Sequence, residues 1–270
     1  MRVGLIGGTG LYTVGSGQVQ EVQVGTPFGL VKLRQMEWAG HEVFFVPRHG
    51  AQHQTPPHRV NYRANIWALR EVGAERVLSS SAVGSLNPEM RPGDLAVVDQ
   101  FLDFTRGRVT TFYEGGAAGV FHVDVTEPYC PELRGAIHAA AKELWGERGP
   151  EGFSVHPSAT YVCAEGPRYE TAAEIRAFRQ LGGDLVGMTN VPEVVLAREA
   201  GLCYATIAVV TNMAAGLAGA PLTHQEVVEV MNRASERLRS LLQATIGRLS
   251  SRTCACASLG GPWPPAIEGP

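Results

Sequence analysis

The stretch Met1-Arg-Val-Gly-Leu-Ile-Gly-Gly-Thr-Gly10 opens the chain with a short apolar run that leads directly into a glycine-rich turn. Its residues 3–6 lack polar alternation, which is typical of a strand covered on both faces. Similar runs recur along the chain, separated by longer segments with helical periodicity. Strands are expected at 3–6, 43–46, 77–78, 95–98, 161–164, 185–186 and 204–210, and helices at 60–73, 132–146, 171–181, 192–200 and 224–249. This alternation predicts one α/β domain over residues 1–249, a three-layer sandwich whose mixed, largely parallel central sheet is flanked by helices.

Composition limits the classes of partner. The chain has 270 residues and a formal net charge of -3 at pH 7, so no overall basic field favours nucleic acid or a membrane surface. It lacks an apolar run of about 18 residues, so no transmembrane helix is expected, and its start does not resemble a signal peptide. Three of the five cysteines are scattered in apolar contexts, which favours a cytoplasmic location.

Residues 250–270 differ from the rest of the chain. The stretch Gly260-Gly-Pro-Trp-Pro-Pro265 cannot continue a helix, so this C-terminal tail is expected to be mobile or to lie loosely on the surface. Cys254 and Cys256 belong to it. A bridge between them would close a small, strained ring, so the sequence leaves their redox state open.

Three segments that follow expected strands suit an anion. In Gly7-Gly8-Thr9-Gly10, glycines let backbone N–H groups approach closely and Thr9 adds a hydroxyl. Arg48-His49-Gly50 supplies a guanidinium fork and an imidazole, and Ser79 to Ser85 supplies hydroxyls and a glycine. The alternatives are a tight turn for the first segment, a solvated loop without a role for the second and a common serine–glycine loop for the third. His53 and His58 follow the second segment, but metal binding there is disfavoured, because no cysteine or carboxylate lies nearby at ligand spacing.

Three further segments suit a flat heterocycle. Glu170 precedes the helix start at Thr171 and could accept hydrogen bonds from a ring N–H and an exocyclic amine, while Tyr169 could stack on the ring. Asn212 follows an apolar strand, and its amide both donates and accepts. The alternatives are a helix-start acid, a turn asparagine and, for Met188 in Gly187-Met188-Thr189, a core residue.

The order and wording of these segments resemble the methylthioadenosine phosphorylase and purine nucleoside phosphorylase family, over about residues 2–249. The resemblance is carried by Ile6-Gly-Gly-Thr-Gly-Leu11, Arg48-His-Gly50, Val60-Asn-Tyr-Arg-Ala-Asn-Ile-Trp-Ala-Leu69, Ala82-Val-Gly-Ser-Leu86, Glu165-Gly-Pro167, Gly187-Met-Thr189 and Val191-Pro-Glu-Val-Val-Leu-Ala-Arg-Glu-Ala-Gly201. It implies a homotrimer, with a dimer of trimers also compatible, and attack of phosphate on the anomeric carbon of a nucleoside. Inorganic phosphate is then a co-substrate, and neither a cofactor nor a metal is implied.

The resemblance also implies roles for individual residues. Those matching phosphate contacts are Thr9, Arg48, His49, Ser81, Ala82 through its N–H, and Thr189. Those matching nucleoside contacts are Met188 beneath the ribose, Tyr169, Glu170, Asn212, Met213, Ala214, His224 at the 5′-hydroxyl, and His122 reaching a neighbouring subunit's sugar site. Asn212, Glu170 and His49 are the expected catalytic residues, the first two stabilising charge on the departing purine.

Base specificity is expected from hydrogen-bond polarity. Adenine-type members of the family carry Asp where this chain has Asn212 and Ala214, and small hydroxyl residues at 169–171. Members that cleave 6-oxopurine nucleosides share the aromatic–Glu pair and the Asn followed by His. The sequence therefore predicts phosphorolysis of inosine and guanosine. An S-methyl-5′-thioadenosine or methylthioinosine phosphorylase is the nearest alternative, and a non-catalytic purine-binding protein is an alternative of another class.

Overall fold

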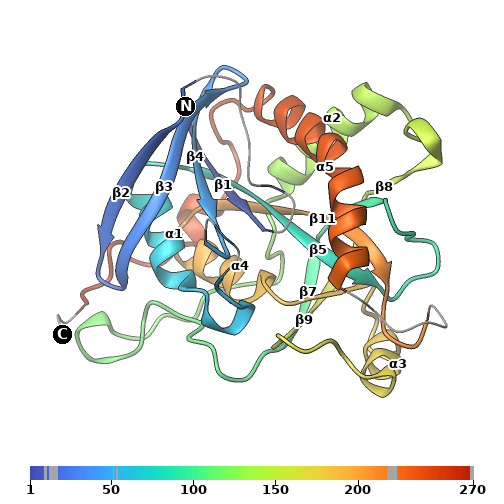
Figure 1. The fold of residues 1–270 in the computed structure, drawn as a ribbon. Coiled ribbons are helices and arrows are strands. Elements are labelled where there is room, and N and C mark those ends of the chain that lie inside the picture. The colour runs from blue at the N-terminus through green and yellow to red at the C-terminus, as the bar shows by residue number, and fades with distance from the viewer. Residues whose placement is uncertain (9–10, 12–17, 51, 53, 218–223, 268–270) are drawn as a thin grey trace.

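One mixed β-sheet organises the molecule, a computed structural model that describes residues 1–8, 11, 18–50, 52, 54–217 and 224–267 (Figure 1). Eight of its strands follow the order β2-β3-β4-β1-β5-β10-β9-β7, while β11 pairs with β5 and β6, and β6 pairs with β8. The strands are β1 (Arg2–Gly7), β2 (Gln20–Thr26), β3 (Gly29–Trp38), β4 (His41–Pro47), β5 (Arg76–Ser85), β6 (Leu95–Val97), β7 (Gln100–Phe104), β8 (Val155–His156), β9 (Thr160–Ala164), β10 (Leu185–Gly187) and β11 (Cys203–Met213).

Parallel pairing dominates the centre of this sheet. β1 runs parallel to β4 and β5, and β5 runs parallel to β11 along most of its length. The pairs β6–β8, β7–β9 and β9–β10 are also parallel, whereas β2–β3, β3–β4, β5–β10 and β6–β11 are antiparallel. The predicted fold class, a mixed and largely parallel sheet in an α/β sandwich, is confirmed.

Helices cover both faces of the sheet. Alternate side chains of one strand enter different cores, because successive residues of a strand point to opposite faces. Ile6 packs with α1 and α4, whereas Leu5 packs with α2 and α5. The helices are α1 (Tyr62–Glu71), α2 (Pro131–Trp145), α3 (Ala172–Gln180), α4 (Asn190–Glu199), α5 (His224–Ile246) and α6 (Cys256–Leu259), with 3-10 turns at Pro57–Arg59, Gly116–Ala118 and Pro150–Gly152.

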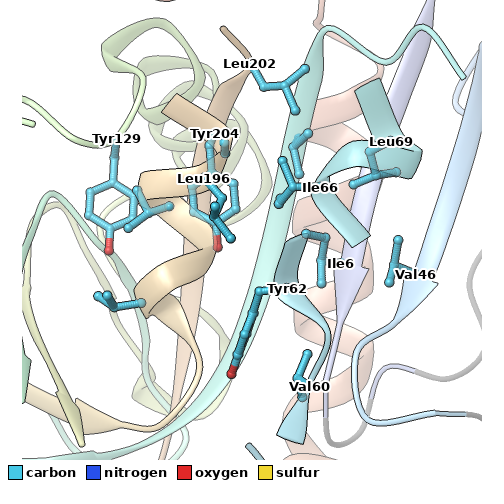
Figure 2. Close-up of a cluster of buried hydrophobic side chains, with 14 of the residues drawn as sticks. Ile6, Val46, Val60, Tyr62, Ile66, Leu69, Tyr129, Leu196, Leu202 and Tyr204 are labelled. Atoms are coloured by element: carbon cyan, nitrogen blue, oxygen red, sulfur yellow. The ribbon is translucent and has the colours of Figure 1, made fainter. Parts of the chain in front are cut away.

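The core on the α1 and α4 side combines aliphatic and aromatic side chains (Figure 2). Ile66 and Leu69 of α1 lie against the sheet, and Leu196 of α4 packs beside Tyr204 of β11. All four are nearly inaccessible to solvent. Burial of an aliphatic side chain of this size stabilises the fold by about 1.5–3 kcal/mol, so these contacts hold α1 and α4 firmly on the sheet.

The hairpin formed by β2 and β3 was not expected from the sequence. Its strands carry many polar residues, and exposed positions dominate β2, because β2 is an edge strand. The strands β7 and β8 were also not expected; β7 is likewise partly exposed and β8 is only two residues long. Within the described ranges, no helix is long and apolar enough to cross a membrane.

The described part of the tail packs against the body of the protein. Trp263 lies 4.6 Å from Trp67 and 5.2 Å from Phe112 between ring centroids. The Tyr113 hydroxyl donates to the Pro262 carbonyl at 2.7 Å, and Cys256 of α6 is buried. The sequence predicted a mobile or loosely attached segment, whereas the described part of the tail is packed. Aromatic contacts and a hydrogen bond hold it, and neither depends on helical periodicity.

An irregularity in β11 matters for the site. Its pairing with β5 runs in register up to Val210, then shifts so that Asn212 lies opposite Gly84. One extra residue, Thr211, is accommodated there as a β-bulge. The Thr211 hydroxyl lies 3.1 Å from the Val83 carbonyl and 2.7 Å from Oδ1 of Asn212, and its single proton can be donated to either oxygen.

Candidate active site

A cavity of about 360 Å³ lies where β1, β4, β5 and β11 end. In open α/β sheets this edge is where ligands bind. Segments from distant parts of the chain meet there. The lining residues that the sequence predicted are Arg48, His49, Ser81, Ala82, Tyr169, Glu170, Met188, Thr189, Asn212 and Ala214, joined by Gly8 of the first glycine-rich turn.

The end of β1 needs glycine for close approach. A Cβ on Gly8 would lie 3.0 Å from Nη1 of Arg48, and one on Gly7 would lie 2.4 Å from the Phe45 ring. The chain can therefore pass directly beside the guanidinium only without side chains here. Thr9, the next residue and a predicted phosphate contact, lies outside the described residues, as does His53.

Arg48 is held rigidly behind the cavity. Its Nε and Nη2 donate to the two carboxylate oxygens of Glu193, each at 2.8 Å, and both side chains are almost fully buried. Nη2 also donates to Oγ of Ser79 at 2.6 Å, and Nη1 to the Ser80 carbonyl at 2.9 Å. Burial alone would lower the pKa of Arg48, but the Glu193 carboxylate outweighs it and raises that pKa, so the cation is permanent.

Glu193 is itself fixed by further donors. The Tyr204 hydroxyl donates to its Oε1 at 2.6 Å, and the Ser79 hydroxyl donates to the same oxygen at 3.0 Å. Burial raises the pKa of Tyr204 well above its usual range, so this phenol remains a donor. A buried ion pair with its remaining hydrogen bonds satisfied keeps one geometry, and Arg48 is therefore preorganised.

A second polar group lies across the cavity wall. Oγ of Ser81 is hydrogen-bonded to the Tyr161 hydroxyl at 3.2 Å and to Oγ1 of Thr189 at 3.3 Å. The backbone N–H of Thr189 donates to the same Tyr161 oxygen at 3.3 Å. Nδ1 of His49 lies 2.8 Å from the Thr55 carbonyl and must donate to it, because a carbonyl only accepts.

Glu170 is a further polar residue of the cavity wall, and its carboxylate can accept hydrogen bonds. Its Oε1 is inaccessible to solvent and makes no hydrogen bond to a described residue. Burial raises the pKa of Glu170 above the ordinary value of 4.5. Tyr169 also lines the cavity and is 38% exposed, so part of this residue is accessible to a ligand. The next helix starts with a complete capping box at Thr171 and Glu174, which fixes the position of Glu170.

Asn212 reaches the cavity because of the bulge in β11. Its Nδ2 donates to the Met213 carbonyl at 3.0 Å, and its Oδ1 lies 2.7 Å from the Thr211 hydroxyl. An amide nitrogen carries two hydrogens, so one N–H remains for a ligand. A Cβ at position 84 would lie 3.1 Å from that nitrogen, and Gly84 therefore makes room for the amide.

A glycine also makes room for the side chain of Met188 at the cavity. Gly166 has φ of 68°, and a Cβ there would lie 2.5 Å from Sδ of Met188. Gly166 therefore combines a left-handed backbone with close packing, which another residue would not tolerate. Met188 thereby adds an apolar residue to the cavity lining.

Two predicted site residues that the structure describes, Met213 and His122, do not line the cavity. Met213 contributes its carbonyl to Asn212 but does not line the cavity itself. His122 is exposed in the segment before α2 and lies outside the cavity wall of its own chain. His224 begins α5, and its side chain is outside the described part; Val227, three residues later, lines the cavity, so the start of α5 borders it.

Sequence reasoning missed the residues that hold the site from behind. Glu193 was interpreted only as part of a helix start, yet it is fully buried against Arg48. Tyr161 was assigned only to a strand, and Gln54 to Pro57 line the cavity without having been singled out. The position of Glu193 among the apolar residues of 191–197 was a signal that it is buried. The sequence did not reveal its partner, because Arg48 is 145 positions away.

The fold and site together define a phosphorylase. The model of the phosphorylase superfamily matches residues 2–247, and the chain belongs to that family. A relative from Moorella thermoacetica, named "Probable 6-oxopurine nucleoside phosphorylase", is 53% identical over 263 residues, covering 97% of this chain and 98% of its own. The "6-oxopurine nucleoside phosphorylase" of Pyrococcus furiosus is 52% identical over 261 residues, covering 94% and 96%.

A solved structure extends the similarity to three dimensions. The methylthioadenosine phosphorylase from Schistosoma mansoni in complex with adenine matches with a TM-score of 0.83 and 34% sequence identity, covering 91% of this chain and 90% of the other. The sequence-based assignment to this family is confirmed, and with it the expectation of an enzyme of the pentosyltransferase type.

Proposed function

We propose that this chain cleaves 6-oxopurine nucleosides such as inosine and guanosine with inorganic phosphate, releasing the free base and ribose 1-phosphate. The observation that carries this proposal is the Glu170 carboxylate at the cavity wall, whose Oε1 makes no hydrogen bond to a described residue. A lactam-form purine has an N1–H that donates to this oxygen. Adenine has no hydrogen on N1, so it would leave the oxygen unpaired at a cost of about 1–3 kcal/mol.

Asn212 supplies the matching donor. Its free N–H suits the O6 or N7 acceptor of a 6-oxopurine, while Glu170 accepts from N1 and, in guanine, from the 2-amino group. Tyr169 offers an aromatic face to the ring. The polarity of the pair therefore corresponds to the lactam form of the base and opposes the amino form.

Phosphate occupies the end of the cavity that Arg48, His49, Ser81 and Thr189 surround, and Thr9 is expected to join them. Arg48 supports this assignment because its ion pair with Glu193 stabilises the buried guanidinium and fixes its orientation before phosphate binds. Gly8 and Ala82 line the cavity as well, and their backbone N–H groups are the further donors that we propose for the anion.

In the proposed reaction, a phosphate oxygen attacks the anomeric carbon as the bond from that carbon to the purine nitrogen breaks. The bonding electron pair leaves with the purine, and the sugar passes through an oxocarbenium-like state above the anionic phosphate. Asn212 donates to the charge that develops on the base, while Glu170 holds the ring in place. Met188 packs against the sugar. This reaction needs neither a covalent enzyme intermediate nor a cofactor.

A methylthio substrate is the second candidate. Val227 makes part of the wall near the start of α5 apolar, which suits a 5′-methylthio group, whereas His224 in the same turn suits a 5′-hydroxyl. Methylthioinosine satisfies the Glu170 argument as well as inosine does. Methylthioadenosine does not, because its base presents the opposite pattern at N1 and C6.

Assembly and location complete the proposal. His122 does not line the cavity of its own chain, which supports its reaching the sugar site of a neighbouring copy in a homotrimer. The enzyme is proposed to work in the cytoplasm. Light scattering coupled to gel filtration gives the mass of the assembly and separates a trimer from a dimer of trimers.

The deciding experiment compares inosine, methylthioinosine and methylthioadenosine, with and without phosphate. We expect phosphate-dependent hypoxanthine release from inosine with the highest kcat/KM. Faster turnover of the adenine-bearing substrate would refute the base assignment. Binding of inosine without turnover would identify a purine-binding protein instead of an enzyme.

A further inference from the structure

Four of the five cysteines meet at one point far from the cavity. The Sγ atoms of Cys130, Cys203, Cys254 and Cys256 all lie within 4.8 Å of one another. The Cys203 and Cys254 sulfurs are 3.2 Å apart, and those of Cys130 and Cys254 are 3.7 Å apart. Three chain segments supply them: the N-cap of α2, the first residue of β11, and the tail at the start of α6.

This arrangement suits a tetrahedral cation. With metal–sulfur bonds of about 2.3 Å, the sulfurs of a tetrahedral tetrathiolate site lie about 3.8 Å apart. The Cys130–Cys254 distance is close to that value and the Cys203–Cys254 distance is somewhat shorter, while no pair in the cluster exceeds 4.8 Å. Three of the four cysteines are buried, so water is largely excluded, and four protein ligands leave no open coordination position. Such closed sites are structural.

Two buried arginines supply compensating charge. A divalent cation with four thiolates carries two net negative charges. Nη1 of Arg198 already donates to Sγ of Cys256 at 3.6 Å, and Arg76 lies close enough to Cys203 and Cys130 for their charges to affect it. The Nε–H groups of both arginines are buried and make no hydrogen bond to a described residue. Thiolates beside them would provide the missing acceptors.

The ligand segment of the tail is itself held in position. Arg76 donates to Oε1 of Glu132 at 2.8 Å. The other oxygen, Oε2, accepts from the backbone N–H groups of Thr253 and Cys254 at 3.1 and 3.0 Å. Because these bonds fix the backbone next to a cysteine ligand, they orient the ligand as outer hydrogen bonds do in metal sites.

We propose that Cys130, Cys203, Cys254 and Cys256 form a structural site for a thiophilic divalent cation, with Zn²⁺ as the ion. The site joins the tail to α2 and to the start of β11. It takes no part in phosphorolysis, because Cys203 and Asn212 lie near opposite ends of β11, roughly 30 Å apart at the usual rise per residue. Sequence analysis expected no metal, and chain separation concealed this cluster.

The test uses full-length, tag-free protein purified under anaerobic reducing conditions, so that no tag contributes ligands. Metal analysis should find one zinc per chain. Titration of metal-depleted protein with Co²⁺ should produce the intense charge-transfer and ligand-field bands of a tetrahedral tetrathiolate complex, and Zn²⁺ should displace them. Zn²⁺ should also raise the melting temperature, since it binds the folded chain.

Two variants locate the site. The double variant Cys254→Ser/Cys256→Ser should lose the cobalt bands and the zinc while it keeps phosphorolysis. The matched control is Cys163→Ser, because Cys163 is also buried but lies outside the cluster. It should keep one zinc per chain.

Three outcomes would overturn the proposal: free thiols with no cobalt bands, disulfides among the four cysteines in the anaerobic protein, or metal retained by the double variant. The cobalt titration uses the unmodified chain, so its answer does not depend on whether a variant folds.

Discussion

Glu170→Gln is the substitution that tests base recognition most directly. It keeps the size of the side chain and replaces a carboxylate oxygen with an NH₂ group. The carboxylate can only accept, so it selects a ring with N1–H. The amide can donate to the unprotonated N1 of adenine while its oxygen accepts from the 6-amino group, so it should favour the ring that the carboxylate rejects.

The magnitude follows from one hydrogen bond. The buried Oε1 has no other partner among the described residues, so its pairing depends on the ligand. An unsatisfied or mismatched buried polar group costs about 1–3 kcal/mol. This corresponds to a fall of about 5- to 150-fold in the ratio of kcat/KM for inosine to that for adenosine. Guanosine should lose more than inosine, because its 2-amino group would meet the new NH₂.

The assay measures phosphate-dependent base release from inosine, guanosine and adenosine by each variant. The matched control is Glu174→Gln, four residues further on. Glu174 pairs with Arg168 and with the backbone of Thr171, and it does not line the cavity. Glutamine is accepted at that capping-box position, so this variant should fold and keep the ratio of the unmodified enzyme.

The reasoning is refuted if Glu170→Gln leaves the inosine-to-adenosine ratio unchanged, or if the control moves it equally. An equal loss for every substrate would also contradict base selection by Glu170, since it would indicate a general structural role.

Four other expectations follow from the same site. The raised pKa of Glu170 should give kcat/KM for inosine an acidic limb with a midpoint above 4.5, and this limb should be absent in Glu170→Gln. Because a raised pKa in the folded state means that ionisation of Glu170 costs stability, Glu170→Gln should also have a higher melting temperature at neutral pH. Differential scanning fluorimetry should show that this difference is lost below pH 4.5. Asn212→Asp should shift kcat/KM toward 6-aminopurine nucleosides, and an unchanged ratio would contradict the donor role. Glu193→Gln should raise the KM for phosphate and reduce the free energy of unfolding by about 3–5 kcal/mol in urea titrations, because Arg48 loses its buried counter-charge. Gly8→Ala should raise the phosphate KM with little effect on inosine affinity in calorimetry, since its Cβ would lie 3.0 Å from Nη1 of Arg48.

The sequence predicted those parts of the fold that local pattern determines. Buried strands such as β1 and β11 are apolar throughout, and helices such as α3 begin with a capping box, so both kinds of element were located. The hairpin β2–β3 was missed, because an edge strand has too many polar residues for a clear signal.

The site divides in a similar way. Residues that directly follow strands, such as Arg48 and Asn212, could be selected because strand ends converge at one edge of a sheet. The partner of Arg48 could not, since only the fold brings Glu193 beside it. The tail was misjudged for the same reason. Neither the position of Trp263 against Trp67 nor the meeting of Cys254 with Cys203 leaves a periodic trace in the sequence.

The bulge at Thr211 separates two requirements that a single strand would otherwise have to meet together. Up to Val210, β11 must keep its pairing register with β5. Beyond Val210, the bulge determines the direction of the Asn212 side chain. The identity of residue 212 can therefore change in evolution with little disturbance of strand pairing. The number of residues in the bulge cannot change in the same way, because removal of one residue would turn the amide to the opposite face. Substrate preference in this fold therefore depends on spacing as much as on chemistry.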